Sequence, residues 1–347
     1  MTMDAKPRVS IVILNWNGWQ DTIECLESLY QITYPNYEVI VVDNGSKDNS
    51  IEMIRKYCEG ELTVESKFIS YNHENKPIGI KEFAKEEIES KKDINNLFEN
   101  SYLSKKLIII KNEKNYGFAE GNNIGIEFAL NNMAEYIFML NNDTVVASDF
   151  LEILVAVIEK DDEVGIAGPT CYFYDTPNTV WQAGIKINWW TSEIKDIKTS
   201  KVEEVDCVSG CAMLIKNTVF KNISLLDTRF PFGYEDFEFC TRARRNGFKV
   251  VNVPDSKIWH KVSMSRNKLM KNMEERNALL GDTGDFRLKD RLFFFKVCSP
   301  RKIQHISQNI FYFAYALPLS AFLLCRRSGA KATLIKAGIF IKEMIRG

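Results

Sequence analysis

The stretch YIFMLNNDTVV, residues 136–146, begins with five residues suited to a β-strand. Two Asn residues and a single carboxylate, that of Asp143, follow them. Asn and Asp bond their own backbone in turns, so a tight turn would by itself explain Asn-Asn-Asp. A carboxylate at a strand end is also a hard oxygen ligand of the kind that Mg²⁺ and Mn²⁺ prefer. His260, one of three histidines in the chain, is a candidate second ligand that would suit Mn²⁺ better than Mg²⁺. This segment alone leaves the turn and the metal site open.

The sequence contains none of the common cofactor or hydrolase fingerprints. There is no GxGxxG after the first predicted strand, no GxxxxGKS/T and no GxSxG. These absences argue against a dinucleotide cofactor, P-loop ATP chemistry and a serine-hydrolase elbow. A protein that handles phosphates without a glycine-rich cradle often uses a divalent metal, held by carboxylates and by the substrate phosphates. The missing fingerprints therefore favour a metal role for Asp143.

Short apolar runs alternate with helical patterns through the first 168 residues, which predicts an α/β fold. The runs are apolar on both sides, as in a mostly parallel sheet whose two faces are covered. Strands are predicted at 9–14, 37–43, 107–111, 136–140 and 164–167, and helices at about 19–30, 51–57, 117–131 and 149–159. Open sheets of this kind bind ligands beyond the carboxyl ends of their strands. Asn15, Asp43, Asn112 and Asp143 all lie at or just past such ends.

Two regions depart from this alternation. Residues of about 62–106 are rich in Lys and Glu and weakly periodic, and we interpret them as a surface insertion with a solvated helix at 81–92. After residue 170 the pattern loosens, with predicted strands at 205–209, 212–215 and 249–253 and a helix that begins with Glu235 and Asp236. Acids at a helix N-terminus interact favourably with the helix dipole, which gives this pair a structural explanation.

The C-terminal part of the chain differs from the rest in charge. Residues 261–347 hold 17 Lys and Arg against 6 Asp and Glu, whereas the first 260 residues hold 28 against 40. The basic part contains an uncharged run at 310–325, shorter than the roughly 20 residues of a spanning helix, and a basic amphipathic pattern at 331–346. We expect peripheral contact with the cytoplasmic leaflet of the cell membrane. A protein contact, such as a homo-oligomer interface, and a true membrane span are the alternatives.

Cysteine usage and the N-terminus indicate the compartment. The eight cysteines include no CxxC pair, and no histidine lies near Cys207 and Cys211 to complete a zinc set. Reduced cysteines in a cytosolic protein are therefore expected. The start MTMDAKPRVS has no long apolar stretch after a charged beginning, so we see no secretory signal. No recognised DNA- or RNA-binding motif accompanies the basic tail, and no nucleic-acid partner is expected.

Four segments together resemble the family 2 glycosyltransferases of the GT-A fold, especially the rhamnosyltransferase-like branch. They read VSIVILNWNGWQDTIECLESL with YEVIVVDNGSKDNS, then NYGFAEGNNIGI, then FMLNNDTVV, then FGYEDFEFCTRARRNGFKVVNVPDSKIWH. The resemblance covers about residues 8–265 apart from the insertion at 62–106. It implies a GT-A-type, Rossmann-like, mostly parallel sheet flanked by helices in residues 1–265, with 266–347 as a basic, apolar helical extension.

The resemblance also implies roles for individual residues. Asp143 matches the last acid of the metal-binding DxD motif, which here reads Asn-Asn-Asp and lacks its first acid. His260 matches a histidine that meets the metal or the diphosphate, and Asp236, beside Glu235, matches the general base. The residues matched to the donor nucleotide are Asn15, Asn17, Asp43, Asn115, Gly117, Gly121, Asn122 and Asn142. Those assigned to the acceptor side are Ser209, Gly210, Cys211 and Trp181, the last from an aromatic region that packing in the core would also explain.

These roles predict an inverting, metal-dependent glycosyltransferase. An inverting transfer needs one carboxylate within reach of the acceptor hydroxyl, and a metal neutralises the leaving diphosphate. The implied donor is dTDP-rhamnose or a UDP-sugar, and the implied acceptor is a glycan or lipid-linked molecule in cell-surface polysaccharide synthesis. A sugar nucleotidyltransferase and a non-catalytic nucleotide-sugar-binding module are the alternatives. A nucleotidyltransferase would need a Gly-rich basic loop after the first strand, where this chain has NWNGW.

Overall fold

The predicted apolar runs assemble into one mixed β-sheet. The computed structural model describes residues 6–89, 105–230, 233–262, 291 and 293–299. The strands are β1 (Val9–Asn15), β2 (Tyr37–Asp43), β3 (Gly79–Ala84), β4 (Lys106–Lys111), β5 (Tyr136–Asn141), β6 (Thr144–Val146), β7 (Val164–Phe173), β8 (Val180–Gln182), β9 (Gly184–Asn188), β10 (Glu193–Ile197), β11 (Glu203–Glu204), β12 (Ala212–Lys216) and β13 (Lys249–His260). The helices are α1 (Trp19–Leu29), α2 (Ser50–Glu59), α3 (Lys85–Glu89), α4 (Phe118–Asn131), α5 (Phe150–Ile158), α6 (Asn217–Ile223) and α7 (Glu235–Arg245), with a short 3-10 helix η1 (His73–Asn75).

The main sheet is mostly parallel, as predicted. Its order across the described residues is β11-β13-β7-β12-β5-β1-β2-β4-β3, with β6 paired to β13 and β8 to β7. β3, β4, β2, β1 and β5 run parallel, as do β7 and β13, and β12 lies antiparallel between β5 and β7. In this register Asn15 at the end of β1 stands opposite Asp43 at the end of β2. The residues that follow β1, β2, β4 and β5 therefore gather at one edge of the sheet.

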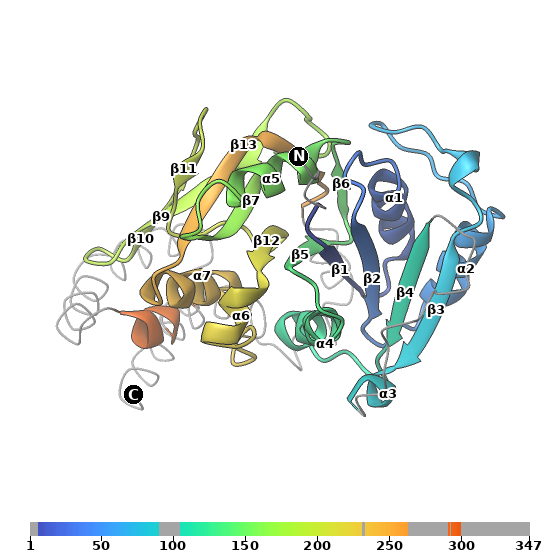
Figure 1. Cartoon of the computed structure of the whole chain (residues 1–347), viewed down its shortest axis with the longest axis horizontal. Helices are drawn as coiled ribbons and strands as arrows, with labels where there is room; N and C mark the ends of the chain where they lie inside the picture. The colour runs from blue at the N-terminus through green and yellow to red at the C-terminus, as the bar shows by residue number, and fades with distance from the viewer. Residues whose placement is uncertain (1–5, 90–104, 231–232, 263–290, 292, 300–347) are drawn as a thin grey trace, which may run out of the picture. The chain divides into compact units, whose positions relative to one another are not determined.

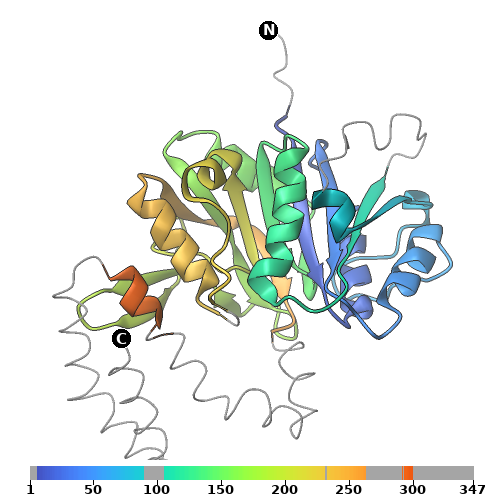
Figure 2. The same ribbon diagram turned by 90° about the horizontal axis from the view of Figure 1, so that it is seen from below.

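Helices cover both faces of the sheet (Figures 1 and 2). α1, α2 and α5 form one core with Ile11 and Ile13 of β1. α4 covers the other face so closely that a Cβ on Gly121 would lie 2.6 Å from Leu14, and one on Gly125 would lie 2.5 Å from Val12. Alternate residues of β1 thus face different helices, as the strand pleat requires. Because both faces are buried, the strand reads as a continuous apolar run.

Two predicted elements differ from the observed ones. The helix predicted at 81–92 is wrong for residues 81–84, which belong to β3, a parallel edge strand beside β4. Glu82 of this strand pairs with Arg55 at 2.5 Å and with Lys111 at 3.1 Å, so charged side chains take the place of an apolar run. The strand predicted at 205–209 is also wrong, because β11 ends at residue 204 and β12 begins at 212.

The segment before β3 is attached to the sheet domain through a buried ion pair. Glu27 of α1 is fully buried and accepts hydrogen bonds from Lys76 at 2.9 Å, from the Tyr57 hydroxyl at 2.7 Å and from the Asn72 backbone N–H at 2.8 Å. The Lys76 ammonium also lies 4.2 Å from the centre of the Tyr57 ring. These contacts stabilise part of the predicted insertion against α1 and α2.

The chain divides into two compact units, which we describe separately. The first comprises residues 1–185 and 196–265 and contains the main sheet, and the second comprises 186–195 and 266–347. In the second, Trp189 packs against Phe294 and Phe295, with ring centroids 5.7 and 5.8 Å apart. The tail segments at 310–325 and 331–346 lie outside the described residues, and the division at residue 265 stays a prediction. The helices that the structure describes are too short or too polar to span a bilayer.

Candidate active site

The side chains at the ends of β1 and β2 bond to one another and to the loops that follow, at the sheet edge. Asn15 is fully buried, and its Nδ2 donates to Asp43 Oδ1 at 2.7 Å and to Ser46 Oγ at 3.2 Å. Asp43 Oδ2 accepts the Ser46 backbone N–H at 3.1 Å. The backbone N–H of Asn17 donates to Ser46 Oγ at 2.9 Å. Three predicted donor-site residues are thus brought together, and Ser46, which the sequence analysis does not identify, joins them.

Thr22 of α1 connects this cluster to the residue before Asp143. Its hydroxyl donates to Asn15 Oδ1 at 2.8 Å and accepts Nδ2 of Asn142 at 3.0 Å. A Cβ on Gly18 would lie 2.8 Å from the same Asn142 nitrogen, so a larger residue there would displace the Asn142 amide. Thr22 belongs to the predicted helix of residues 19–30, but no sequence signal marks it as a site residue.

A second amide cluster joins the ends of β2 and β4 to the start of α4. Asn44 Nδ2 donates to Asn115 Oδ1 at 2.9 Å and to the Gly117 carbonyl at 3.1 Å. Its Oδ1 accepts Nδ2 of Asn112 and the Tyr116 N–H, both at 3.1 Å. Gly117 has a φ of 87°, in the left-handed region that favours glycine. Asn44 is therefore the centre of this cluster, although only its position after β2 could have indicated it.

Gly121 and Asn122 have packing explanations. Gly121 allows the close approach of α4 to β1. Asn122 is buried, and its Nδ2 donates to the Phe118 carbonyl of the same helix at 2.9 Å. The roles of these two residues in donor binding stay predictions.

Asp143 and His260 meet because two strands pair. Asp143 lies in the turn between β5 and β6, and His260 ends β13. β13 runs antiparallel to β6 and sets His260 opposite Thr144. This register brings His260 Nε2 to 3.0 Å from Asp143 Oδ1, and both side chains are buried.

Burial and mutual attraction decide the charge of this pair. Burial acts to raise the pKa of Asp143, but the hydrogen bond and charge of His260 outweigh it and leave that pKa below its usual value. Burial acts to lower the pKa of His260, but Cys211 and Asp143 outweigh it and raise that pKa to about 9. In the metal-free protein both groups are therefore charged at neutral pH. His260 Nδ1 is buried and has no hydrogen-bond partner among the described residues.

The Asp143–His260 pair fits part of a divalent-metal site. A carboxylate oxygen and an imidazole nitrogen 3.0 Å apart suit neighbouring positions around one ion. Within the described ranges no group of three or more His, Cys, Asp or Glu could hold a metal alone. An ion bound here would take its remaining ligands from substrate phosphates and water, which is the usual arrangement for Mg²⁺.

Asp236, in the first turn of α7, is attached to the loop before β12. Its Oδ2 accepts the Gly210 N–H at 2.9 Å, and its Oδ1 accepts the Phe237 N–H at 2.9 Å. A Cβ on Gly210 would lie 3.1 Å from the Asp236 Cβ, so a larger residue there would crowd Asp236. Burial raises the pKa of Asp236, and these backbone hydrogen bonds counter it only in part. A raised pKa makes the carboxylate a better proton acceptor.

The acids beside Asp236 are engaged in structural contacts. Glu235 is buried and accepts the Gly233 N–H at 2.7 Å. Glu238 is buried and forms an ion pair with Arg242 at 2.8 Å. Asp236 is partly exposed. It is therefore the acid of these three that is best placed to meet a substrate.

The start of β12 links Asp236 to the turn that carries Asp143. The Cys211 carbonyl accepts the Asn141 N–H at 2.8 Å, and its neighbour Gly210 holds Asp236. The predicted base and the predicted metal ligand thus flank adjacent strand ends, those of β5 and β12.

The residues predicted for the acceptor side lie around the same strand ends. Trp181 of β8 packs edge-on against His260, with ring centroids 4.7 Å apart. The Ser209 hydroxyl accepts the Cys211 N–H at 3.3 Å, and Cys211 Sγ lies 3.7 Å from Cys171 Sγ. The structure brings these residues together, and their contact with an acceptor stays a prediction.

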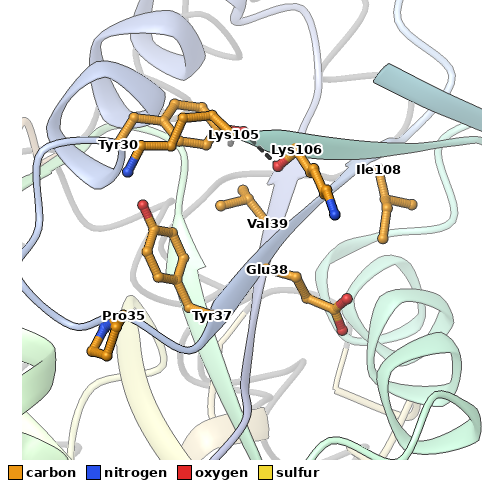
Figure 3. A pocket seen from close by; sticks show the side chains of 8 residues that line it. All are labelled: Tyr30, Pro35, Tyr37, Glu38, Val39, Lys105, Lys106 and Ile108. Carbon is orange, nitrogen blue, oxygen red and sulfur yellow. Dashed lines mark hydrogen bonds between the residues drawn. The ribbon is translucent and has the colours of Figure 1, made fainter. Parts of the chain in front are cut away.

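Figure 3 shows a cavity of about 210 Å³ that contains none of the predicted site residues. It lies at the amino ends of β2 and β4, where it is lined by Tyr30, Pro35, Tyr37, Glu38, Val39, Lys105, Lys106 and Ile108. Open α/β sheets bind their ligands at the carboxyl ends of the strands. We therefore take the opposite edge, with Asp43, Asp143 and Asp236, as the candidate active site.

Two family models match the chain. The model described as "Glycosyltransferase like family 2" matches residues 89–278, more than half of the chain, and the model described as "Glycosyl transferase family 2" matches residues 10–82. Together the matches take in the clusters around Asp43, Asp143 and Asp236.

Individual relatives are distant. The dTDP-rhamnosyl transferase RfbF of Shigella flexneri is 25% identical over 149 residues, which cover 43% of this chain and 50% of the relative. An uncharacterized glycosyltransferase of Haemophilus influenzae is 24% identical over 289 residues, which cover 79% of this chain and 71% of the relative. The chain therefore spans only about half the length of RfbF.

Solved structures share the fold. GalNAc-T7, solved with UDP, GalNAc and Mn²⁺, has a TM-score of 0.52 and 20% identity, covering 73% of this chain and 43% of that one. The mannosyltransferase PcManGT of Pyrobaculum calidifontis, solved with GDP-Man and Mn²⁺, has a TM-score of 0.50 and 14% identity, covering 97% of this chain and 87% of that one. At these identities the likeness concerns the fold alone.

Proposed function

The chain belongs to glycosyltransferase family 2 and has the GT-A fold that its motifs predict, and from this premise we propose that it is an inverting, metal-dependent glycosyltransferase. The observation that carries the proposal is the Asp143–His260 pair, 3.0 Å apart, at the sheet edge where Gly210 also holds Asp236.

In this proposal Asp236 accepts the proton of the acceptor hydroxyl. The acceptor oxygen forms a bond to the anomeric carbon of the donor as the bond to the diphosphate oxygen on the opposite face breaks. The configuration at the anomeric carbon therefore inverts, and no covalent intermediate with the protein forms. Asp143 and His260 would hold Mg²⁺ or Mn²⁺, which supplies positive charge to the leaving nucleoside diphosphate.

The proposed donor is dTDP-rhamnose or a UDP-sugar. One relative is named as a dTDP-rhamnosyl transferase, and one structural neighbour was solved with UDP and Mn²⁺, which supports these two classes. The proposed acceptor is a glycan or a lipid-linked molecule of cell-surface polysaccharide synthesis. We assign the donor nucleotide to the amide clusters around Asn15 and Asn44 and the acceptor to the side of Trp181 and Ser209.

The basic C-terminal part would give the enzyme access to a lipid-linked acceptor. We propose that residues 266–347 make peripheral contact with the cytoplasmic face of the cell membrane; a protein contact, such as an oligomer interface, and a membrane span are the alternatives. The net positive charge of residues 261–347 supports an anionic partner of this kind.

A panel of nucleotide sugars, screened with and without Mn²⁺, tests the proposed function. The expected result is metal-dependent release of a nucleoside diphosphate from one donor class. Formation of pyrophosphate from a nucleoside triphosphate and a sugar phosphate would instead indicate a nucleotidyltransferase. Donor binding without turnover, across all donors and with glycan and lipid-linked acceptors added, would indicate a binding module and contradict the proposal.

A further inference from the structure

The peptide group that joins His260 to Lys261 is anchored through both its N–H and its carbonyl. The N–H of Lys261, the next residue, donates to the Asp143 carbonyl at 2.9 Å. The His260 carbonyl accepts the Tyr174 N–H at 3.0 Å. The peptide group after His260 is therefore attached on one side to Asp143, the residue that the His260 side chain meets, and on the other side to Tyr174.

The Lys261 side chain anchors the same point to α1. Its Nζ lies 2.7 Å from Asp21 Oδ1 and 2.6 Å from Glu24 Oε2. The Tyr174 hydroxyl donates to Glu24 Oε1 at 2.7 Å, and the Lys261 ammonium lies 5.1 Å from the centre of the Tyr174 ring. Asp21 and Glu24 are buried, and the Lys261 side chain is only 17% exposed. Charges this well buried depend on one another, because removing one leaves the others unpaired.

The contacts of Lys261 with Asp21 and Glu24 influence how the Asp143 and His260 side chains are placed relative to each other. His260 projects from the end of a strand, and the turn with Asp143 is held to that end by β6 and by Lys261. α1 carries Thr22 between the two acids that bind Lys261, and Thr22 bonds Asn142 at 3.0 Å. The Lys261 cluster therefore connects, through α1, both sides of the Asp143–His260 pair. Groups that orient metal ligands in this way typically change metal affinity when they are removed.

We propose that Lys261, through Asp21 and Glu24, is a positioning residue that sets the separation of Asp143 and His260 for metal binding. The inference rests on the proposed function, because it concerns the metal of that reaction. Lys261 contacts neither the metal nor the substrate in this account. It acts by holding the end of β13 against α1.

The test is the affinity of the full-length protein for Mn²⁺ alone, measured by electron paramagnetic resonance of the free ion. Lys261→Met should raise the Kd for Mn²⁺ about tenfold or more. Lys261→Arg keeps the charge and should restore most of the affinity. With the donor identified in the screen, Lys261→Met should also raise the Mn²⁺ concentration for half-maximal activity while kcat at saturating Mn²⁺ recovers toward the wild-type value.

Lys249, at the other end of β13, offers a matched control. It also pairs with two acids, Asp161 at 2.9 Å and Glu163 at 2.6 Å, but its side chain is 37% exposed. Lys249→Met should leave the Kd for Mn²⁺ unchanged. If Lys261→Met does not fold, the triple variant Asp21→Asn/Glu24→Gln/Lys261→Met removes the charges of Lys261 and its two acids together, so that neither acid is left without Lys261. It should still show weakened Mn²⁺ binding.

The outcomes separate this inference from the proposed function. If Asp143→Ala weakens Mn²⁺ binding but Lys261→Met and the triple variant bind like the wild type, the positioning role is wrong and the metal site stands. An equal loss in Lys249→Met would likewise overturn the role, since it would reflect a general weakening of β13. If Asp143→Ala binds Mn²⁺ like the wild type, the proposed metal site itself is wrong.

Discussion

The Nε2 atom of His260 lies 3.0 Å from Oδ1 of Asp143, although the two residues are 117 positions apart in the chain. Strand pairing creates this contact, because β13 runs antiparallel to β6 and ends beside the turn that carries Asp143. The same turn is bonded to the start of β12, where Gly210 holds Asp236. Three groups suited to metal binding and proton transfer therefore belong to one sheet edge.

Replacing Asp143 with Asn should remove the charged metal ligand while keeping its shape. We expect metal-dependent transfer to fall by about 100-fold or more, since the cation that would neutralise the leaving diphosphate loses its anionic protein ligand. The measurement is a titration of activity with Mn²⁺. Asp149→Asn is the matched control, because Asp149 is exposed nearby and its side chain makes no cap hydrogen bond to α5. Equal activity in the two variants would contradict the assignment.

Replacing Asp236 with Asn should separate donor binding from transfer. The single amide oxygen of Asn can accept the Gly210 N–H, which lies 2.9 Å from Oδ2 in the native protein, and the hydrogen bond lost is the one from the Phe237 N–H of the same helical turn, so we expect the loop to keep its conformation. It cannot accept a proton, and the transfer rate should fall by about 10²–10⁴-fold. Donor affinity, measured by calorimetry, should stay near the wild-type value. A variant that transfers at the native rate would show that another group is the base.

The metal-free protein should lose stability at alkaline pH because of His260. Its pKa is about 9 in the folded protein against an ordinary value of 6.5, so folding favours the protonated form. The contribution is fully present below about pH 6.5 and is lost as the pH rises through about 9, on the order of 3 kcal/mol in all. Urea denaturation across this range measures it. The free energy of unfolding of His260→Gln should lack this pH dependence. If it falls with pH as steeply as that of the wild type, His260 is not the source.

Replacing Lys76 with Met should destabilise the fold without touching the candidate site. The substitution leaves the fully buried Glu27 carboxylate without its cation and should cost about 3–5 kcal/mol of the free energy of unfolding. Lys56→Met is the control, because Lys56 and Glu52 form an exposed pair at 2.8 Å that contributes little. Both are measured by urea denaturation. Similar stabilities for the two variants would mean that the buried pair is not needed.

Local pattern accounts for the parts of the fold that could be predicted. A run such as residues 9–14 reads as a strand because both of its faces are covered, and the polar residue that ends each run marks the ligand-binding edge. The same rule explains the errors. β3 is an edge strand whose charged side chains pair across its surface, so it lacks an apolar run. In residues 205–209 the apolar side chains of Val205 and Val208 pack against Gly184 and Gly168, and Cys207 forms only an isolated bridge with Ile185, so the apolar residues do not mark a strand.

By itself, the sequence determined the order of strands and helices, the edge at which Asp43 and Asp143 emerge and the family to which the motifs belong. Only the tertiary structure decided which side chains meet there, including Thr22, Asn44, Ser46 and the Lys261 cluster on α1. The physical reason is that periodicity and turn chemistry act over a few residues. Hydrogen bonds between Asn142 and Thr22, or between Lys261 and Asp21, join residues that only strand pairing and helix packing bring within reach.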